Sequence, residues 1–196
     1  MCLLQFNGVL GVFNCQGGGW CREFRRNQCF SEYSKPVSCK TGPNDVEWIN
    51  GHKPFPVEGV QLFAMYLSKQ DKLVLSKLSD TIDISLEPFS YELIIVSPVT
   101  PLPWDSTGQF APIGLVNMLN TGGAIKLFDI INDDDEKMVL VGVKGAGEMR
   151  VYSSEKPRAC RVNGEEIKFE YEDGMVKVHL SWNDHWAGLS KVEYLF

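Results

Sequence analysis

A run of four acidic residues, Asp133 to Glu136, is the densest set of possible cation ligands in the chain. An EF-hand loop needs a glycine at its sixth position and a bidentate glutamate at its twelfth. Whether the first ligand is placed at Asn132 or at Asp133, lysine or methionine falls where the glycine is needed, and valine or lysine where the glutamate is needed. We therefore interpret the run as a solvated hairpin tip and expect no metal and no cofactor.

The six cysteines lack the close C-x-x-C spacing that presents two thiolates to one zinc ion. They are Cys2, Cys15, Cys21, Cys29, Cys39 and Cys160. The first residues do not form a basic and then apolar secretion signal, and no Asn-x-Ser/Thr sequon occurs. Both observations favour free thiols in the cytoplasm, with a chloroplast location open if a transit segment precedes this sequence.

No constellation for covalent hydrolysis is visible. The G-x-S-x-G motif is absent, and the three histidines, His52, His179 and His185, stand in ordinary strand or loop contexts. Retaining glycosyl transfer needs two carboxylates about 5–5.5 Å apart on a rigid frame. Among 25 acidic residues some pair will meet that distance by accident, so we name no catalytic residue.

The turn Gln16-Gly-Gly-Gly-Trp-Cys21 could cradle an anion, but it lacks the lysine and hydroxyl of a phosphate loop. We interpret it as a tight reversal in which Trp20 is an apolar anchor for a neighbouring domain. Stacking of Trp20 on a sugar is the alternative. Cys15 and Cys21 are expected to be packing residues. Trp182 and Trp186 could likewise form a sugar platform, although coverage of a sheet end is the simpler interpretation.

Composition limits the possible partners. The net charge of −6 and a pI near 5.1 argue against nucleic-acid binding, and we interpret the cluster Arg22, Arg25 and Arg26 as a solvated face. No apolar run approaches 18 residues, so we expect no membrane span. A length of 196 residues with 44% apolar residues suits one domain.

Alternation of apolar and polar residues predicts an all-β fold, a two-sheet antiparallel sandwich. The continuous apolar run Leu93–Val96 indicates a central strand, and residues 22–56 and 97–108 are expected to be long loops. Further short strands are predicted at Val37–Lys40 and Val46–Ile49. The other expected strands are Val9–Asn14, Gly59–Leu67, Leu73–Leu78, Ile82–Leu86, Ser90–Val96, Gly114–Asn120, Ala124–Ile131, Met138–Val143 and Met149–Ser153.

The clearest hairpin lies near the end of the chain, where Asn163-Gly164 and Asp173-Gly174 suit two-residue loops. If Asp173-Gly174 is a loop, one face carries only apolar pairs and the other pairs Glu170 with Lys177 and Lys168 with His179. The apolar pairs predicted to be largely buried are Tyr171 with Val176, Phe169 with Val178 and Ile167 with Leu180.

Three long strings, Gly8–Cys21, Phe110–Ile125 and Gly147–Pro157, closely resemble the C-terminal region of plant raffinose synthases, the galactinol–sucrose galactosyltransferases. The strings Asn14–Trp20 and Ser85–Phe89 are more similar to raffinose synthases than to stachyose-forming or alkaline α-galactosidase relatives. The resemblance implies a β-sandwich that follows a (β/α)8 barrel. In that family the catalytic aspartates lie on the barrel, and no position here matches their motifs.

The resemblance leads to a functional expectation. The parent enzyme transfers galactose from galactinol to sucrose, giving raffinose and myo-inositol, and residues 1–196 would be its single C-terminal domain, with 1–7 a remnant of the barrel junction. This chain alone is expected to be structural, with an apolar patch of Val9–Phe13 and Trp20 that faced the barrel and drives self-association. The alternatives are a free-standing carbohydrate-binding module and an active hydrolase.

Overall fold

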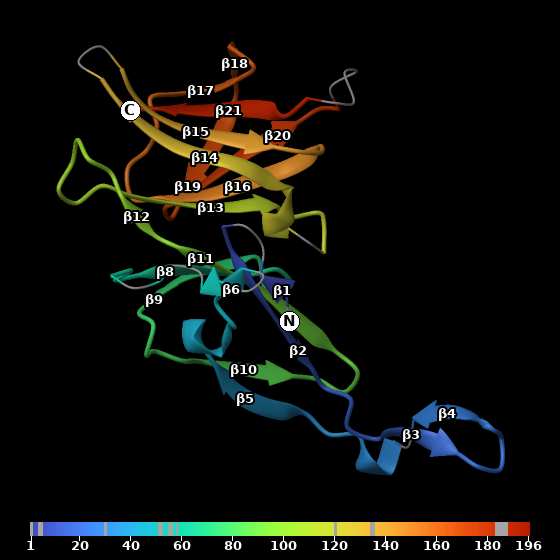
Figure 1. The fold of residues 1–196 in the computed structure, drawn as a ribbon. Helices are drawn as coiled ribbons and strands as arrows, with labels where there is room; N and C mark the ends of the chain where they lie inside the picture. Colours follow the sequence, from blue (N-terminus) through green and yellow to red (C-terminus); the bar gives the residue numbers. More distant parts are fainter. Residues whose placement is uncertain are drawn as a thin grey trace.

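The computed structural model describes residues 2–3, 6–29, 31–50, 53–54, 57, 59–119, 121–133, 136–182 and 188–196. The described residues form an all-β fold in which every strand pairing is antiparallel, which confirms the predicted class (Figure 1). In this part of the chain three short 3₁₀ turns lie between strands: η1 (Ser31–Tyr33), η2 (Pro43–Asp45) and η3 (Thr121–Ala124). Within the described ranges no helix is long and apolar enough to cross a membrane.

Two five-stranded sheets form the predicted sandwich, in the upper half of Figure 1. The outer sheet contains, in spatial order, β14 (Ile125–Asn132), β15 (Lys137–Val143), β21 (Ser190–Leu195), β17 (Ala159–Val162) and β18 (Glu165–Ile167). The middle sheet contains β12 (Thr100–Pro101), β13 (Gln109–Leu115), β16 (Gly147–Ser153), β20 (Met175–Leu180) and β19 (Phe169–Glu172). Their facing apolar side chains, among them Val141, Val151 and Tyr194, form the largest core cluster.

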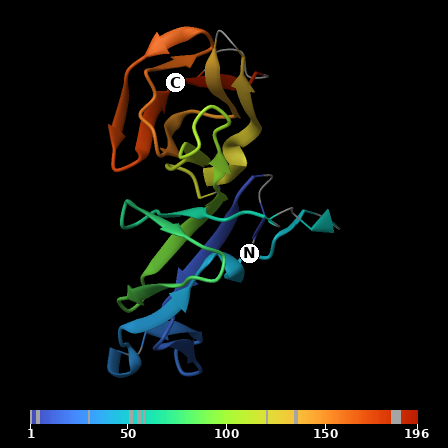
Figure 2. The same cartoon turned by 90° about the vertical axis from the view of Figure 1, so that its left-hand side faces the viewer.

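A third five-stranded sheet is stacked on the middle sheet, so the fold has more layers than the sequence predicted (Figure 2). This lower sheet contains β1 (Cys2–Leu3), β2 (Gly8–Phe13), β11 (Tyr91–Pro98), β8 (Phe63–Leu67) and β9 (Lys72–Ser76). Tyr66 and Ile95 pack with Ile113 and Met175 of the middle sheet. The face of the lower sheet that points away is covered by a two-stranded ribbon, β5 (Val37–Thr41) and β10 (Ile82–Leu86).

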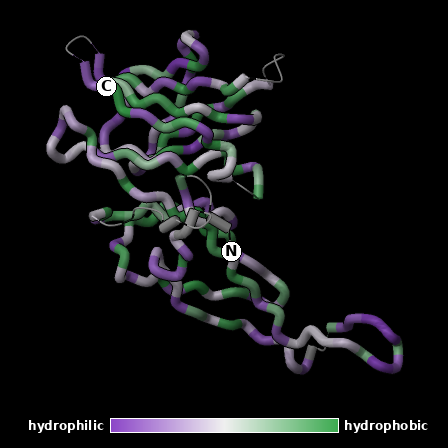
Figure 3. Tube along the Cα trace, viewed as in Figure 1, coloured by the Kyte–Doolittle hydropathy of each residue, from purple (hydrophilic) through white to green (hydrophobic). Residues whose placement is uncertain are grey.

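Two short hairpins complete the described strands: β3 (Gly18–Cys21) with β4 (Arg26–Cys29), and β6 (Ile49–Asn50) with β7 (Lys53–Pro54). Apolar residues follow the stacked sheets, whereas the far end of the β3–β4 hairpin is hydrophilic (Figure 3).

Several predictions made from strand patterns are confirmed. β11 is the middle strand of its sheet, and Ile94 and Ile95 are buried on its two opposite faces. Asp173 and Gly174 have the positive φ values, 49° and 78°, of a two-residue hairpin loop. The register follows, because Phe169 pairs with Val178, Tyr171 with Val176 and Glu170 with Lys177.

The predicted hairpin was too long. Ile167 pairs with Cys160 in the outer sheet, not with Leu180, and Lys168 does not pair with His179. The chain changes sheets at Lys168, which is how strands turn the corner of a sandwich. Since β19 is an edge strand, Phe169 is only partly buried.

Other strand limits also differ. β13 spans Gln109–Leu115 rather than Gly114–Asn120, because Gly114 lies in a bulge with a φ of 117° and residues 116–119 form turns. The strand expected at Val46–Ile49 is wrong. Asp45 Oδ2 instead accepts hydrogen bonds from the Gly42 N–H (2.9 Å) and the Thr41 hydroxyl (3.0 Å), which stabilises η2 and leaves Val46 buried behind it.

Candidate functional site

The strongest cluster of charged side chains surrounds Arg150, at the junction of the middle and lower sheets. Its guanidinium Nη1 donates to the Tyr66 hydroxyl (2.8 Å) and to the Asp71 carboxylate, and Nε donates to Glu148. The Tyr66 hydroxyl donates to Asp71 Oδ1 (3.0 Å), and the guanidinium carbon lies 5.1 Å from the centre of the Tyr66 ring. β16 and β8 position Arg150 and Tyr66, and the turn after β8 supplies Asp71.

This network does not resemble the carboxylate pair of a glycosyl-transfer enzyme. Both carboxylates bind the same guanidinium, whereas one carboxyl of a retaining pair must be able to donate a proton and the other to attack the sugar. Burial is the main cause that lowers the pKa of the Arg150 guanidinium and that raises the pKa of the Tyr66 hydroxyl. The arrangement holds two sheets together and leaves no group poised for proton transfer.

Buried nucleophile candidates are equally unsuited to catalysis. Burial raises the pKa of the Cys160 thiol to about 12, so it carries almost no thiolate near neutral pH. Burial also raises the pKa of the Tyr194 hydroxyl well above its usual value. Both side chains belong to the sandwich core, where they pack between sheets.

The other residues considered from the sequence are scattered. His179 is an exposed residue of β20, while His52, His185 and Trp186 lie outside the described residues. Asp133 and Glu136 flank the loop between β14 and β15, as expected of a hairpin tip, and Asp134 and Asp135 are outside the described residues. The described ranges contain no group of three or more His, Cys, Asp or Glu side chains that could hold a metal ion.

An exposed aromatic surface is the clearest candidate for a functional site. Phe13 and Tyr91 are opposite each other on β2 and β11, at the end of the lower sheet, and their rings stack with centroids 5.9 Å apart. Phe13 is 63% exposed, and the Lys69 ammonium lies 4.5 Å from the centre of the Tyr91 ring.

The position of this pair follows from strand periodicity. Val9, on the same strand face as Phe13, packs against the cluster between the lower and middle sheets. Four residues further along, the middle sheet no longer covers the face and Phe13 is exposed. The adjoining cleft of about 280 Å³ is lined by Ser68, Lys69, Tyr91, Leu93, Val116, Asn117, Met118 and Leu119. We call the surface formed by Phe13, Tyr91, Leu93, Met118 and Leu119 the end surface.

The predicted apolar patch therefore differs from the observed surface. Leu10 is buried and Val12 packs beneath the ribbon, because both face the opposite side of β2. The sequence analysis did not predict that this surface includes Tyr91, Met118 and Leu119. The position of Tyr91 could have been inferred from a strand register that pairs it with Phe13. Met118 and Leu119 come from the turns after β13, and nothing in their local sequence marks them as neighbours of β11.

Trp20 is 61% exposed on the β3–β4 hairpin, which extends away from the sheets (Figure 1). Of the three glycines before it, Gly17 has a positive φ of 85° and forms the turn, while Gly18 and Gly19 already belong to β3. Cys15 is exposed and Cys21 is partly exposed, so neither is the packing residue that was expected. Trp182 is also strongly exposed.

A second cleft, of about 370 Å³, lies along the edge hairpin of the middle sheet. It is lined by Glu148, Lys168, Phe169, Glu170, Lys177, Val178 and His179. Glu170 is directly opposite Lys177, so acidic and basic groups alternate and no side of the cleft has a uniform charge. We do not assign a ligand to it.

Comparison with known proteins finds plant galactosyltransferases among the relatives of this chain. The chain is 53% identical over 194 residues to the probable galactinol–sucrose galactosyltransferase 5 of Arabidopsis thaliana and 50% identical to the galactinol–sucrose galactosyltransferase of Pisum sativum. It is 33% identical to the stachyose synthase of Pisum sativum. In the first two comparisons 99% of this chain is matched, but it spans only 24% of each relative.

The family model described as raffinose synthase or seed imbibition protein Sip1 matches residues 1–181. This match covers nearly the whole chain, and about half of the residues are identical in two relatives. The resemblance seen in the three sequence strings therefore extends over nearly the whole fold. This chain therefore belongs to the raffinose synthase and seed imbibition protein family.

Proposed function

We propose that this chain is the non-catalytic β-sandwich part of a raffinose-synthase-type enzyme, in which it supports the catalytic barrel. The parent activity would be transfer of galactose from galactinol to sucrose, giving raffinose and myo-inositol. The observation that carries the proposal is the end surface, where the lower sheet extends past the middle sheet and leaves Phe13, Tyr91 and Leu119 exposed. Apolar surface of this kind marks a contact with another protein part.

The contacts of the described charged residues are consistent with a supporting, non-catalytic role. Asp71 and Glu148 both bind Arg150, and Cys160 is a core residue. The five cysteines with described side chains are unpaired, which supports our proposal that the protein works in the cytoplasm.

Carbohydrate binding by the isolated chain is the second candidate, because Trp20 and Trp182 are exposed aromatic residues. The end surface is a poor platform for a sugar. The Tyr91 ring stacks on Phe13 and is also in contact with the Lys69 ammonium. A platform on which a sugar stacks needs an uncovered ring face. Direct titration with sucrose, raffinose and galactinol tests this candidate. Under the main proposal it should show no saturable binding, whereas saturable binding that is lost on Trp20→Ala or Trp182→Ala would favour a binding module.

Activity measurements test the main proposal. The purified chain incubated with galactinol and sucrose, or with an aryl α-galactoside, should give only the uncatalysed background, because the described residues include no acid and nucleophile that are positioned to act. Turnover that disappears when one Asp or Glu of this chain is replaced would overturn the proposal. It would also establish an active site in the sandwich itself.

The supporting role needs its own test. The chain should restore galactosyl transfer when it replaces the matching segment of the Pisum sativum enzyme, and Phe13→Ala combined with Tyr91→Ala should impair that chimera. We also propose that the free chain self-associates through the end surface. Sedimentation of the wild-type chain and of the same double variant would show this, with the variant shifted toward the monomer.

A further inference from the structure

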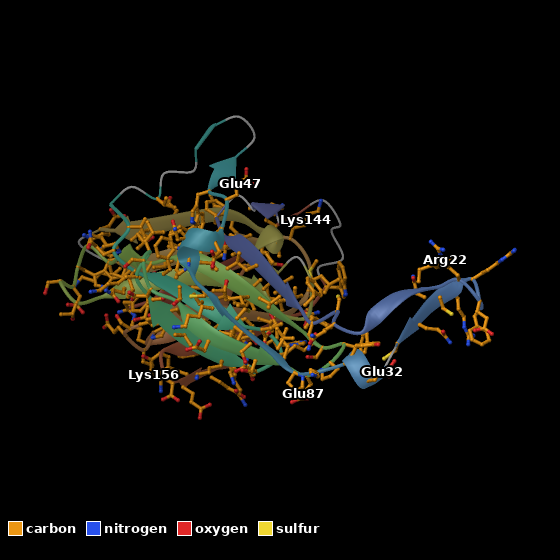
Figure 4. All side chains as sticks on the ribbon, turned by 90° about the horizontal axis from the view of Figure 1, so that it is seen from below. Arg22, Glu32, Glu47, Glu87, Lys144 and Lys156 are labelled. Atoms are coloured by element: carbon orange, nitrogen blue, oxygen red, sulfur yellow. The ribbon has the colours of Figure 1, made fainter. Side chains whose placement is uncertain are left out.

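The β3–β4 hairpin, residues Gly18–Cys29, is a second exposed feature, which we call the arm. Its two strands pair with each other and with no other described strand. Viewed from below, the arm projects away from the sheets and carries Arg22 near its far end (Figure 4). Two-stranded hairpins are at best marginally stable alone in water, so an arm that stands clear of the sheets gains stability from a contact.

The arm presents two large aromatic side chains to solvent. Trp20 is 61% exposed and Phe24, in the turn between the strands, is 57% exposed. The only described ring or cation contact of Phe24 is the Arg26 guanidinium, 5.5 Å from its ring centre. Aromatic side chains flanked by arginine are the residue types that contribute most to protein–protein contacts.

The base of the arm is fixed, in contrast to its exposed tip. Asn14 is buried, and its amide nitrogen donates to the carbonyl of Lys35 (2.8 Å) and to that of Leu86 (3.0 Å). Its Oδ1 accepts a hydrogen bond from the Gln16 N–H (3.1 Å). One side chain therefore joins the segment that enters the arm, the segment that leaves it and the ribbon. The arm projects from a defined point.

Charge and sequence coverage indicate what the arm contacts. Its turn, Arg22-Glu-Phe-Arg-Arg26, has three arginines and one glutamate in a chain whose net charge is −6. The arm lies inside the segment matched by the family, while about three quarters of each long relative lies outside the matched part. We propose that the arm docks on this remaining part of the enzyme, with Trp20 and Phe24 in an apolar pocket and the arginines at its acidic rim.

This inference rests on the proposed function, and the chimera separates the two. In the chimera, Trp20→Ala with Phe24→Ala should reduce galactosyl transfer by about tenfold or more and lower the melting temperature. Arg22→Glu should weaken activity through charge repulsion. The matched control is Leu75→Ala, an exposed apolar side chain on the edge strand β9, which should have little effect.

Two further measurements distinguish docking from an internal role. The same arm variants in the isolated chain should leave its melting temperature unchanged, because the aromatic side chains are exposed there. Hydroxyl-radical oxidation of Trp20 and Phe24, read by mass spectrometry, should be strong in the isolated chain and suppressed in the chimera.

The possible outcomes separate the docking of the arm from the proposed function. An active chimera in which Trp20 stays oxidisable and the arm variants keep full activity overturns the docking of the arm and leaves the proposed function standing. Equal destabilisation of the isolated chain by the arm variants also overturns it, since the residues would then act within the sandwich. A folded but inactive unmodified chimera overturns the proposed function, and the arm inference with it.

Discussion

Replacing Asp71 with alanine should lower the free energy of unfolding by about 1.5 kcal/mol. Asp71 accepts hydrogen bonds from the Arg150 guanidinium and from the Tyr66 hydroxyl, and the Arg150 side chain is only 8% exposed. Loss of the acceptor leaves a buried cation with Glu148 as its remaining carboxylate. A buried polar group that loses a hydrogen-bond partner costs about 1–3 kcal/mol of stability. We expect a value in the lower half of this range, because the Asp71 side chain is 55% exposed and water can replace it next to the guanidinium.

The chain offers a matched control in the ion pair of Glu136 and Arg161. Its atoms are 3.6 Å apart and both side chains are about 40% exposed. Glu136→Ala should therefore change stability by less than about 0.5 kcal/mol. The two variants remove the same kind of group from an arginine, so burial of the arginine is the main difference between them.

Urea unfolding followed by tryptophan fluorescence measures both variants. A double-mutant cycle with Arg150→Met should give a coupling energy of about 1 kcal/mol or more between Asp71 and Arg150, because the double variant no longer contains the underpaired cation. If Asp71→Ala and Glu136→Ala have equal effects, or if the cycle gives no coupling, the network does not clamp the middle and lower sheets as we argue.

Three other substitutions test backbone positions with positive φ and the edge of the middle sheet. Gly114→Ala should destabilise by about 2–4 kcal/mol in thermal unfolding, since the residue has a φ of 117° and a Cβ would lie 2.1 Å from the Thr121 carbonyl oxygen. Gly164→Ala, also at positive φ but with open space around it, should cost only about 1 kcal/mol; similar losses at both positions would refute the steric argument. Phe169→Ala should cost about 2 kcal/mol in urea unfolding, below the 3–5 kcal/mol of a fully buried phenylalanine, because its strand is at the edge. A loss above about 3 kcal/mol would mean that Phe169 is more deeply packed than the structure shows.

Features set by neighbouring residues were predictable from the sequence. The register around Asp173-Gly174 was correct because a two-residue loop fixes which residues face each other. The central position of β11 was correct because an unbroken apolar run must be covered on both faces.

Features that depend on distant contacts were not predictable in this way. Ile167 continues the alternating pattern of the hairpin but pairs with Cys160, since the chain changes sheets at Lys168. The third sheet was missed because the apolar run of β11 indicates that both of its faces are covered but not which distant elements cover them. Arg150 gave no signal either, as its partners Tyr66 and Asp71 are about 80 positions away.

The layered stack explains why the end surface exists. In a two-layer sandwich one face of each sheet is solvated, and its strands would carry polar residues there. The lower sheet is covered on both sides over most of its length, by the ribbon and by the middle sheet, so β2 and the Leu93–Val96 run of β11 are apolar on both faces.

Where these strands extend past the middle sheet, they still carry the apolar residues of a covered strand. Phe13 and Tyr91 are therefore exposed to solvent. At the opposite end of β2 and β11, buried polar groups join the lower sheet to the middle sheet. The Asn7 amide donates to the carbonyl of Pro112 (2.7 Å), and the Ser97 hydroxyl donates to the same oxygen (2.8 Å). Pairing of β2 with β11 and the Phe13–Tyr91 stack hold the end surface itself, so burying it against a partner would require little further ordering of these two strands.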